Sequence, residues 1–127
     1  MTLQYQHMTK PIDIVNEFYE TWNTRDLDAM ASLLNDDVTY EGPLLTWNGK
    51  DEYVKGAKEL LPMCGGVKVV KQYADGNSVL SILDITLNSP DGPIVCHTAD
   101  QVELKNGKLH KTKAFYDPSK IAKYCSP

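Results

Sequence analysis

The fold of this chain is decided by residues 94–118, which read IVCHTADQVELKNGKLHKTKAFYDP. Two runs of alternating side chains flank Asn106 and Gly107, and Asn-Gly between such runs is a strong signal for a β-hairpin. Alternate positions of the first run are mostly apolar, which predicts a face packed on the core. They are Cys96, Thr98, Asp100, Val102 and Leu104. Because Asp100 stands in the middle of this face, its carboxylate needs a partner, a changed protonation state or a chemical role.

Length and charge restrict the classes of protein to which the chain can belong. Its 127 residues fit one domain, residues 1–127, with one hydrophobic core. A hydrophobic content of 42% and a charged content of 24% are ordinary for a globular protein. The net charge of −4 disfavours a surface that binds nucleic acid. No apolar run approaches the roughly 20 residues that span a bilayer, so we expect no membrane partner.

The N-terminus and the cysteines indicate a compartment. The first residues, MTLQYQHMTK, contain no apolar signal core, so we expect no export signal. Cys64, Cys96 and Cys125 are scattered and odd in number, which argues against a disulfide framework and for a reducing compartment. No pair of them has the spacing of metal ligands. We therefore expect a cytoplasmic protein without a metal site.

Three helices are predicted in the N-terminal half, after a flexible tail at residues 1–10. Their expected ranges are Pro11–Asn23, Leu27–Leu34 and Lys50–Leu61. Helical spacing predicts one apolar stripe on the first helix, made of Ile12, Val15, Phe18, Tyr19 and Trp22. Tyr19 and Trp22 can be plain core packing, or Tyr19 can point its hydroxyl into a cavity. Asp26 is the expected N-cap of the second helix, and Gly56 inside the third suggests close approach by another element.

From Val67 onward the pattern becomes that of β-strands. The expected strands are Val38–Glu41, Val67–Tyr73, Ser78–Leu87 and the two arms of the hairpin, with a helical turn at Ser119–Tyr124. The apolar loop 44–49 contains Trp47, whose exposure would be costly. This ring is therefore expected to cover the core, a partner or a ligand opening. The order predicted overall is three helices followed by a strongly bent sheet.

Strand register determines which side chains share the face of Asp100. After the turn at residues 89–93, we expect Asn88 to pair with Ile94. Asp84 then lies on the same face as Asp100. The two aspartates become diagonal neighbours on adjacent strands, with Cα atoms about 7–8 Å apart.

The Asn-Gly turn allows two registers for the second arm of the hairpin. A two-residue loop places Asp100 opposite Lys113, and an ion pair then explains the carboxylate as a structural feature. A three-residue loop with Gly107 in the left-handed conformation places Asp100 opposite Thr112 instead. We favour the three-residue loop because it surrounds the carboxylate with small and polar groups.

These registers predict a concave face roofed by the apolar sides of the helices. Its residues are Asp84, Thr98, Asp100, His110, Thr112 and Tyr116. Two nearby carboxylates in a medium of low dielectric constant raise the pKa of one of them. Such a carboxyl can act as a general acid or base, or stay protonated and donate a hydrogen bond to an oxyanion. The alternative is a pair of solvated structural aspartates, with His110 also solvated near the hairpin tip.

Two stretches, at residues 18–43 and 99–121, carry a resemblance to known proteins: FYETWNTRDLDAMASLLNDDVTYEGP and ADQVELKNGKLHKTKAFYDPSKI. The chain resembles the nuclear transport factor 2 superfamily, which includes ketosteroid isomerases, SnoaL-like polyketide cyclases and limonene epoxide hydrolases. The resemblance covers nearly the whole chain. It implies a cystatin-like α+β cone, in which three N-terminal helices pack on a strongly curved, mainly antiparallel sheet. It also implies a cavity for apolar small molecules and a homodimer formed through the outer face of the sheet.

Compared with ketosteroid isomerases, the chain keeps one functional position and loses another. Their protonated oxyanion-hole aspartate corresponds to Asp100. Their general base, just before a proline at the end of the first strand, corresponds to Gly42, with Glu41 beside it. Their oxyanion tyrosine on the first helix corresponds to Phe18, and Tyr19 is one residue away. The resemblance thus implies a functional carboxyl at Asp100 without the isomerase base.

Compared with limonene epoxide hydrolases, the catalytic set is incomplete. Asp84 resembles the aspartate of their Arg-x-Asp pair, but Ile82 stands in place of the arginine. Ala114 stands in place of the aspartate of their last strand. A SnoaL-like cyclase needs little more than one acid–base carboxyl in a shaped apolar cavity, and the sequence contradicts this scheme least.

Three functional hypotheses follow from these residues. The first is a cofactor-independent isomerase or cyclase, in which Asp100 shuttles a proton on an apolar carbonyl compound of the polyketide, steroid or terpenoid type and Tyr19 or Tyr116 bonds its oxygen. The second is a non-catalytic ligand-binding or dimerisation module. The third is epoxide hydrolysis by Asp84 and Asp100. Beside these catalytic candidates, the residues expected to contact the ligand are Phe18, Trp22, Tyr40, Trp47, Tyr53, Thr98, His110, Thr112 and Tyr116.

Overall fold

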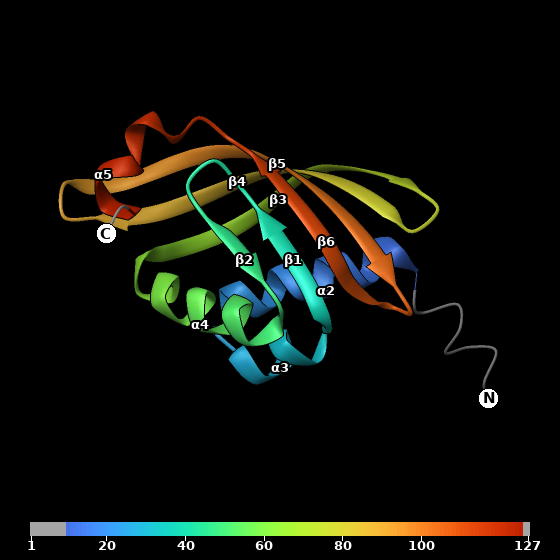
Figure 1. The fold of residues 1–127 in the computed structure, drawn as a ribbon. Coiled ribbons are helices and arrows are strands. Elements are labelled where there is room, and N and C mark those ends of the chain that lie inside the picture. The colour runs from blue at the N-terminus through green and yellow to red at the C-terminus, as the bar shows by residue number, and fades with distance from the viewer. Residues whose placement is uncertain (1–9, 126–127) are drawn as a thin grey trace.

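The computed structural model describes residues 10–125 of the chain. A strongly curved sheet wraps around the helices, and the C-terminal segment returns to one end of the sheet (Figure 1). In chain order the elements are α2 Pro11–Thr24, α3 Leu27–Ser32, β1 Leu34–Glu41, β2 Thr46–Asn48, α4 Lys50–Leu60, η1 Leu61–Met63, β3 Cys64–Asp75, β4 Ser78–Ser89, β5 Gly92–Lys105, β6 Lys108–Phe115, η2 Pro118–Lys120 and α5 Ala122–Cys125. The flexible tail expected at residues 1–10 lies outside the described residues, except for Lys10.

The six strands form one sheet in the order β2-β1-β6-β5-β4-β3. Neighbouring strands are antiparallel, except that β1 and β6 run parallel. Strands β3, β4 and β5 have 12, 12 and 14 residues, and twist accumulates along strands of this length. Register shifts in the β3–β4 and β5–β6 pairs add to the bend. The predicted class is confirmed: an α+β domain with α2, α3 and α4 packed on a curved, mainly antiparallel sheet, to which the chain adds the short helices η1, η2 and α5.

Helix α2 supplies a long apolar surface above the sheet. It begins at Pro11, where the missing N–H has no helical partner to lose. Its buried residues are Ile14, Val15, Phe18, Tyr19 and Thr21. The helix ends at Thr24 because Arg25 adopts the left-handed conformation, with φ 61°. The Arg25 guanidinium then donates to the carbonyl oxygens of Leu61 and Cys64 at 2.6 and 2.8 Å, which joins the helix end to the start of β3.

Helix α3 ends two residues earlier than the sequence predicts. The Asp26 side chain accepts a hydrogen bond from the Ala29 N–H at 3.0 Å, so the predicted N-cap is confirmed. The helix ends at Ser32 rather than Leu34, because Leu34 already belongs to β1 and pairs with Leu109 of β6.

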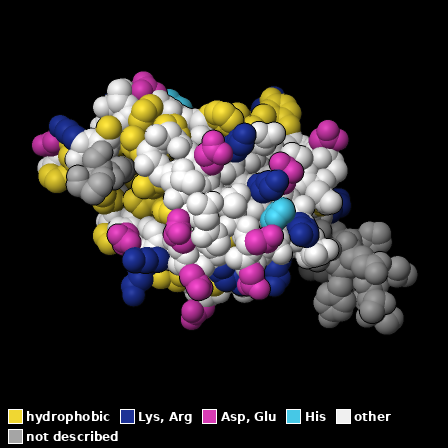
Figure 2. Space-filling view, viewed as in Figure 1, with side chains coloured by type: hydrophobic (Ala, Val, Ile, Leu, Met, Phe, Trp, Pro, Cys, Tyr) yellow, Lys and Arg dark blue, Asp and Glu magenta, His cyan; other side chains and the backbone are white. Residues whose placement is uncertain are grey.

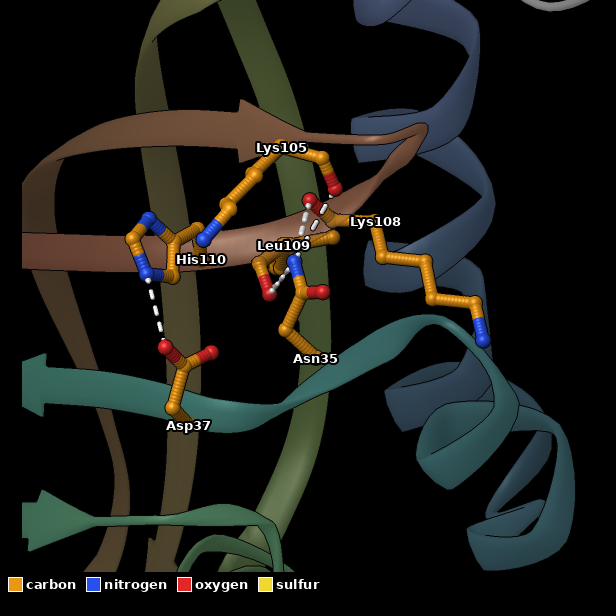
Figure 3. Close-up of polar contacts among 6 residues, drawn as sticks. All are labelled: Asn35, Asp37, Lys105, Lys108, Leu109 and His110. Atoms are coloured by element: carbon orange, nitrogen blue, oxygen red, sulfur yellow. Dashed lines mark hydrogen bonds and ion pairs between the residues drawn. The ribbon is translucent and has the colours of Figure 1, made fainter.

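The start of β1 also anchors the tip of the β5–β6 hairpin (Figure 3). The Asn35 side chain donates to the carbonyl oxygens of Lys105, Lys108 and Leu109 at 3.0, 3.3 and 3.3 Å. One side-chain amide of β1 therefore binds both arms of the hairpin. This contact fixes where the parallel β1–β6 pair begins.

The register of β4 and β5 differs from the predicted one by one residue. Asn88 pairs with Pro93 instead of Ile94, because the turn is shorter than expected and β5 already begins at Gly92. Side chains alternate between the two faces of a strand, so a slip of one residue moves a side chain to the opposite face. Asp84 therefore points to the outer face of the sheet and not to the face of Asp100.

The Asn-Gly hairpin has the two-residue loop, so the favoured three-residue loop is wrong. Lys105 pairs with Lys108 across the turn. Asn106 and Gly107 have φ values of 55° and 76°. Positive φ at both central residues is the type I′ conformation, which matches the twist of the flanking strands.

A bulge follows the turn and shifts the rest of the pair. Leu104 pairs with Leu109, whereas Glu103 pairs with Lys111, so His110 is the extra residue of β6. Asp100 consequently lies opposite Ala114, and neither of the two predicted partners is correct. The bulge nevertheless keeps the even-numbered residues from 112 onward on the face of Asp100.

The interior is packed with apolar side chains, and the face seen in Figure 2 carries charges of both signs. The largest fully buried side chains include Met30, Leu34, Leu83, Leu109, Val15, Val38, Val79 and Val102. Acidic and basic side chains are interspersed over the face seen in Figure 2, and they form no continuous basic patch there. Over residues 10–125, no helix is both long enough and apolar enough to cross a membrane.

Candidate functional site

A cavity of about 130 Å³ lies between the helices and the inner face of the sheet. Its lining residues are Phe18, Tyr19, Trp22, Tyr40, Leu45, Trp47, Tyr53, Leu60, Cys64, Val67, Leu83, Ile85, Leu87, Cys96, Thr98, Asp100, Tyr116 and Ile121. Among these described residues, Asp100 carries the only carboxyl group, and none is Lys, Arg or His. The site is therefore an aromatic and aliphatic chamber with a single acid.

Asp100 lies on the inner face of β5, between two small neighbours. It pairs with Ser81 of β4 and Ala114 of β6, and it is 8% exposed. The Tyr19 hydroxyl on α2 donates to its Oδ2 atom at 3.2 Å. Burial disfavours the charged form and raises the pKa of Asp100 to about 7, and the Tyr19 hydrogen bond opposes this rise in part. The carboxyl can therefore gain or lose its proton near neutral pH.

Tyrosine side chains from two helices and one strand line the cavity with Asp100. Burial, and next the charge of Asp100, raises the pKa of Tyr19 and of Tyr40 far above the ordinary value. Burial, and next Tyr40, does the same to the pKa of Tyr53. These hydroxyls stay protonated at neutral pH. They are hydrogen-bond donors to a ligand or to Asp100, and not bases.

Trp47 forms part of an aromatic wall on one side of the cavity. Its ring centroid lies 5.1 Å from that of Tyr40 and 5.0 Å from that of Tyr53. A Cβ atom at Gly56 of α4 would come within 2.2 Å of the indole. The predicted close approach at Gly56 is therefore confirmed, and Trp47 covers both the core and the cavity.

The C-terminal segment closes another side of the cavity. Tyr116 and Ile121 belong to its lining. The Tyr124 hydroxyl donates to Asp91 in the β4–β5 turn, and Lys123 Nζ lies 3.6 Å from the same carboxylate. In Figure 1 the helix α5 lies beside this turn. These contacts hold the segment in place against the end of the sheet.

Most of the residues predicted for the site do line the cavity. They are Phe18, Tyr19, Trp22, Tyr40, Trp47, Tyr53, Thr98, Asp100 and Tyr116. They come from α2, β1, β2, α4, β5 and the segment after β6. The apolar stripe of α2 and the inner parity of β5 are the two sequence patterns that bring most of them together.

Asp84 does not belong to this group, and its predicted place beside Asp100 is wrong. It lies on the outer face of the sheet, opposite His97 in the β4–β5 pair. Its Oδ1 atom is 2.6 Å from His97 Nδ1. The expected pair of carboxylates is therefore not formed, and burial alone accounts for the raised pKa of Asp100.

His110 and Thr112 also lie outside the cavity lining. The bulge turns the His110 ring toward β1, where its Nε2 atom is 3.3 Å from Asp37 Oδ2 (Figure 3). Thr112 is buried opposite Val102, and its hydroxyl has no hydrogen-bond partner among the described residues. Both were expected at the site only because of the three-residue loop.

Sequence reasoning missed half of the lining. The missed residues are Leu45, Leu60, Cys64, Val67, Leu83, Ile85, Leu87, Cys96 and Ile121. The alternation of Leu83, Ile85 and Leu87 would have revealed three of them had the register of β4 been correct. Cys96 shares the parity of Asp100, but as a cysteine it was considered for a disulfide or a metal ligand and not for the cavity lining. Nothing in the local sequence around Ile121 points to a cavity.

The position of the isomerase base holds no carboxyl that reaches the cavity. Glu41 is exposed and pairs with Lys113 of β6 and Thr46 of β2. At Gly42, a Cβ atom would come within 2.9 Å of the Tyr40 hydroxyl. A side chain at this position would therefore collide with the cavity wall.

The cavity also contains two thiols. Cys64 and Cys96 are buried and free. Within the part of the chain that the structure describes, no three His, Cys, Asp or Glu side chains lie close enough together to hold a metal ion.

The fold and the site define a class of protein: an α+β cone with one buried carboxyl in an aromatic cavity. The model of the SnoaL-like domain family matches residues 15–111. The chain belongs to the SnoaL-like domain family. The sequence has no match among curated proteins.

Solved structures share the fold over nearly the whole chain. A nuclear transport factor 2-like protein of unknown function from Cytophaga hutchinsonii is 24% identical, with a TM-score of 0.80 over 89% of this chain and 95% of that one. An epoxide hydrolase from M. tuberculosis, similar to limonene epoxide hydrolase, is 20% identical, with a TM-score of 0.79 over 91% and 88%. A putative polyketide cyclase from Sinorhizobium meliloti is 16% identical, with a TM-score of 0.71 over 80% and 93%. At these identities the likeness concerns the fold.

Proposed function

We propose that the protein binds a small apolar carbonyl compound and catalyses a cofactor-independent isomerisation or cyclisation, with Asp100 as the acid–base residue. The observation that carries the proposal is a single carboxyl with a pKa of about 7 inside an otherwise uncharged cavity. A general acid or base works best when its pKa lies near the working pH. A buried structural aspartate would instead be expected to have a cation or several donors around it.

The arrangement around Asp100 supports a proton shuttle. The Tyr19 hydroxyl donates to Oδ2, and Asp100 lines the cavity, so Oδ1 is the oxygen that we expect to meet a ligand. In its ionised form Asp100 would take a proton from the substrate carbon next to the carbonyl group. It would then return this proton to another atom of the same substrate. Tyr40 and Tyr116 line the same cavity, and their side chains are candidates to contact the carbonyl oxygen while negative charge develops there.

The size of the cavity limits the ligand. An apolar cavity of about 150 Å³ is large enough to hold benzene, and this cavity measures about 130 Å³. Compounds with one ring, such as monocyclic terpenoids or small aromatic ketones, should therefore be tried first. A steroid or a polyketide of several rings would need the C-terminal segment or Trp47 to move.

Replacing Asp100 with asparagine tests the proposal directly. With a compound that the protein converts, turnover should fall at least about 100-fold, because general acid–base catalysis contributes on that scale. Turnover by the parent protein should also follow one ionisation near pH 7, rising with pH if Asp100 acts as base. Compounds can be chosen by the rise in melting temperature that they cause. Asp84→Asn, on the outer face, is the matched control.

The results separate the proposed enzyme from a binding module. Unchanged turnover in Asp100→Asn excludes the acid–base role. Stabilisation by a ligand that no condition converts favours the alternative of a non-catalytic binding protein. Epoxide hydrolysis through Asp84 and Asp100 is not proposed, because Asp84 lies on the outer face, bonded to His97.

We also propose that the outer face of the sheet forms a homodimer. This face has exposed hydrophobic side chains, among them Phe115 at 55% and Val95 at 49% exposure. Phe115, Ala99 and Ile82 form one row across β6, β5 and β4. Apolar surface that is contiguous in this way is typical of an interaction site, and a two-fold pair would bury the same patch on both copies.

A charge placed in this row should separate the copies. Phe115→Lys is expected to convert a dimer into a monomer in sedimentation or light scattering, because each interface would bury two new charges. Glu59→Lys on the exposed side of α4 is the control and should leave the mass unchanged. A monomeric parent protein at concentrations of about 100 μM would contradict the proposal, because obligate interfaces of this type persist there.

A further inference from the structure

A chain of hydrogen bonds runs from the surface to Asp100, and of its other members only Tyr19 lines the cavity. Gln72 Nε2 on β3 donates to Asn16 Oδ1 at 2.7 Å and to Ser81 Oγ at 3.0 Å. Ser81 is hydrogen-bonded to the Tyr19 hydroxyl. Tyr19 in turn donates to Asp100 Oδ2 at 3.2 Å. The exposed end of the chain is Asn16.

Sheet register and helical spacing both place these residues together. Gln72 pairs with Ser81, and Ser81 pairs with Asp100, so the three side chains form a row across β3, β4 and β5 on the inner face. Asn16 and Tyr19 lie three residues apart on α2, a spacing that puts them on one face of the helix. Helix α2 therefore contacts both ends of the row: Asn16 binds Gln72, and Tyr19 binds Asp100.

From Gln72 to Tyr19 one donor of each residue points toward the carboxyl, while the second N–H of Gln72 donates outward to Asn16. The Gln72 amide has two N–H groups, one for Asn16 and one for Ser81. Ser81 Oγ accepts from Gln72, so its own O–H is available to Tyr19. The hydrogen bond with Ser81 lowers the pKa of Tyr19, and donation by the Ser81 hydroxyl to the phenolic oxygen is part of the proposal. The single proton of Tyr19 then has one acceptor left, which is Asp100 Oδ2.

Burial makes this orientation hard to change. Ser81 is 0% exposed, and a buried hydroxyl that lost its partners would be costly. Bonds in such a chain polarise one another, so a donor to Tyr19 makes Tyr19 a better donor to the carboxylate. A serine is not needed here for packing alone, because its inner-face neighbours along β4, Val79 and Leu83, are hydrophobic.

We propose that Ser81, held by Gln72, is a positioning residue for Asp100: it directs the Tyr19 proton onto Oδ2 and so leaves Oδ1 as the oxygen that exchanges a proton with the ligand. The acid–base role of Asp100 rests on the function proposed above. The direction of the Tyr19 proton does not depend on it. The other titratable groups that line the cavity with Asp100 are Tyr19 of α2, Tyr40 of β1, Tyr53 of α4, Cys64 of β3, Cys96 of β5 and Tyr116 after β6. Burial keeps Tyr19, Tyr40 and Tyr53 neutral near pH 7.

The test follows the carboxyl carbon of Asp100 by NMR through its titration, with the signal assigned by its loss in Asp100→Asn. Ser81→Ala should raise the titration midpoint by a few tenths of a pH unit, because removing one donor weakens the next bond by roughly 10–30%. Ser81→Thr keeps a hydroxyl and should restore the midpoint. Ser78→Ala is the matched control, since Ser78 lies on the same strand and the register turns it to the outer face. Equal midpoints in Ser81→Ala and Ser78→Ala would overturn the proposal.

Gln72→Met provides a second variant at a half-buried position, where folding is less at risk than at Ser81. It removes both N–H donors at similar volume and should raise the midpoint in the same direction by a smaller amount. An unchanged midpoint in this variant also counts against the proposal. A raised midpoint in both variants, with no compound bound or converted, supports the positioning role and contradicts the proposed reaction. Loss of turnover in Asp100→Asn with unchanged midpoints in both variants supports the proposed reaction and contradicts the positioning role.

Discussion

Asp100→Asn should make the protein more stable than its parent above neutral pH, and the gain should disappear in acid. The pKa of Asp100 is about 7 in the folded chain against an ordinary value of 3.8. Between these values the folded state holds a proton that the unfolded state has already released, so stability falls as pH rises. The full stability is present below about pH 4 and is lost by about pH 7. The shift corresponds to roughly 4 kcal/mol.

The measurement is the free energy of unfolding in urea for both proteins at a series of pH values. The difference between them should change by roughly 4 kcal/mol in favour of the asparagine variant between about pH 4 and 8. Subtracting the two curves removes the contributions of all other ionisable groups. Asp28→Asn is the matched control, because this exposed carboxyl stays in contact with water in both states. A constant difference across the range would show that Asp100 is not desolvated.

Gly56→Ala should destabilise the fold, although alanine is the better helix former. The new methyl group would meet the Trp47 indole at 2.2 Å, and moving this ring in a packed wall costs about 1–3 kcal/mol. Over most of this range the cost exceeds the gain of about 1 kcal/mol from helix propensity. The indole should also turn toward the cavity, so a ligand that stabilises the parent protein should stabilise the variant less.

A double-mutant cycle with Trp47→Leu isolates the cause. With the smaller side chain in place, Gly56→Ala should become neutral or stabilising by up to about 1 kcal/mol, so the two changes should be coupled by roughly 1–3 kcal/mol, the cost of moving the ring. Glu59→Ala on the exposed side of the same helix is the control for helix propensity. If Gly56→Ala has the same effect with and without Trp47, the contact is not the reason for glycine at this position.

Much of the fold could be predicted because its signals are local. The apolar stripe of α2, the cap at Asp26 and the Asn-Gly turn each depend on residues within a few positions of one another. The main error in the helices concerned Leu34. It extends the apolar pattern of α3, yet it belongs to β1 because Leu109 of a distant strand pairs with it. A partner 75 positions away leaves no mark on local periodicity.

The candidate site was predicted in part, for a reason that lies in the registers. Asp100 and Tyr19 were identified from parity and helical spacing, and they do meet, at 3.2 Å. Asp84 was placed wrongly because a register that differs by one residue reverses every side chain of a strand. Ser81, which the correct register puts opposite Asp100, was missed for the same reason.

The sequence by itself determined the order of helices and strands and the inward face of β5, including an acid among apolar neighbours, since side-chain period and turn chemistry are written in adjacent residues. Only the tertiary structure decided what surrounds that acid. A type I′ turn, a bulge at His110 and a two-residue turn before Gly92 set which strand residues meet. Because each of these changes the pairing by a single residue, they separate Asp84 from the cavity and bring Ser81 and Ala114 to either side of Asp100.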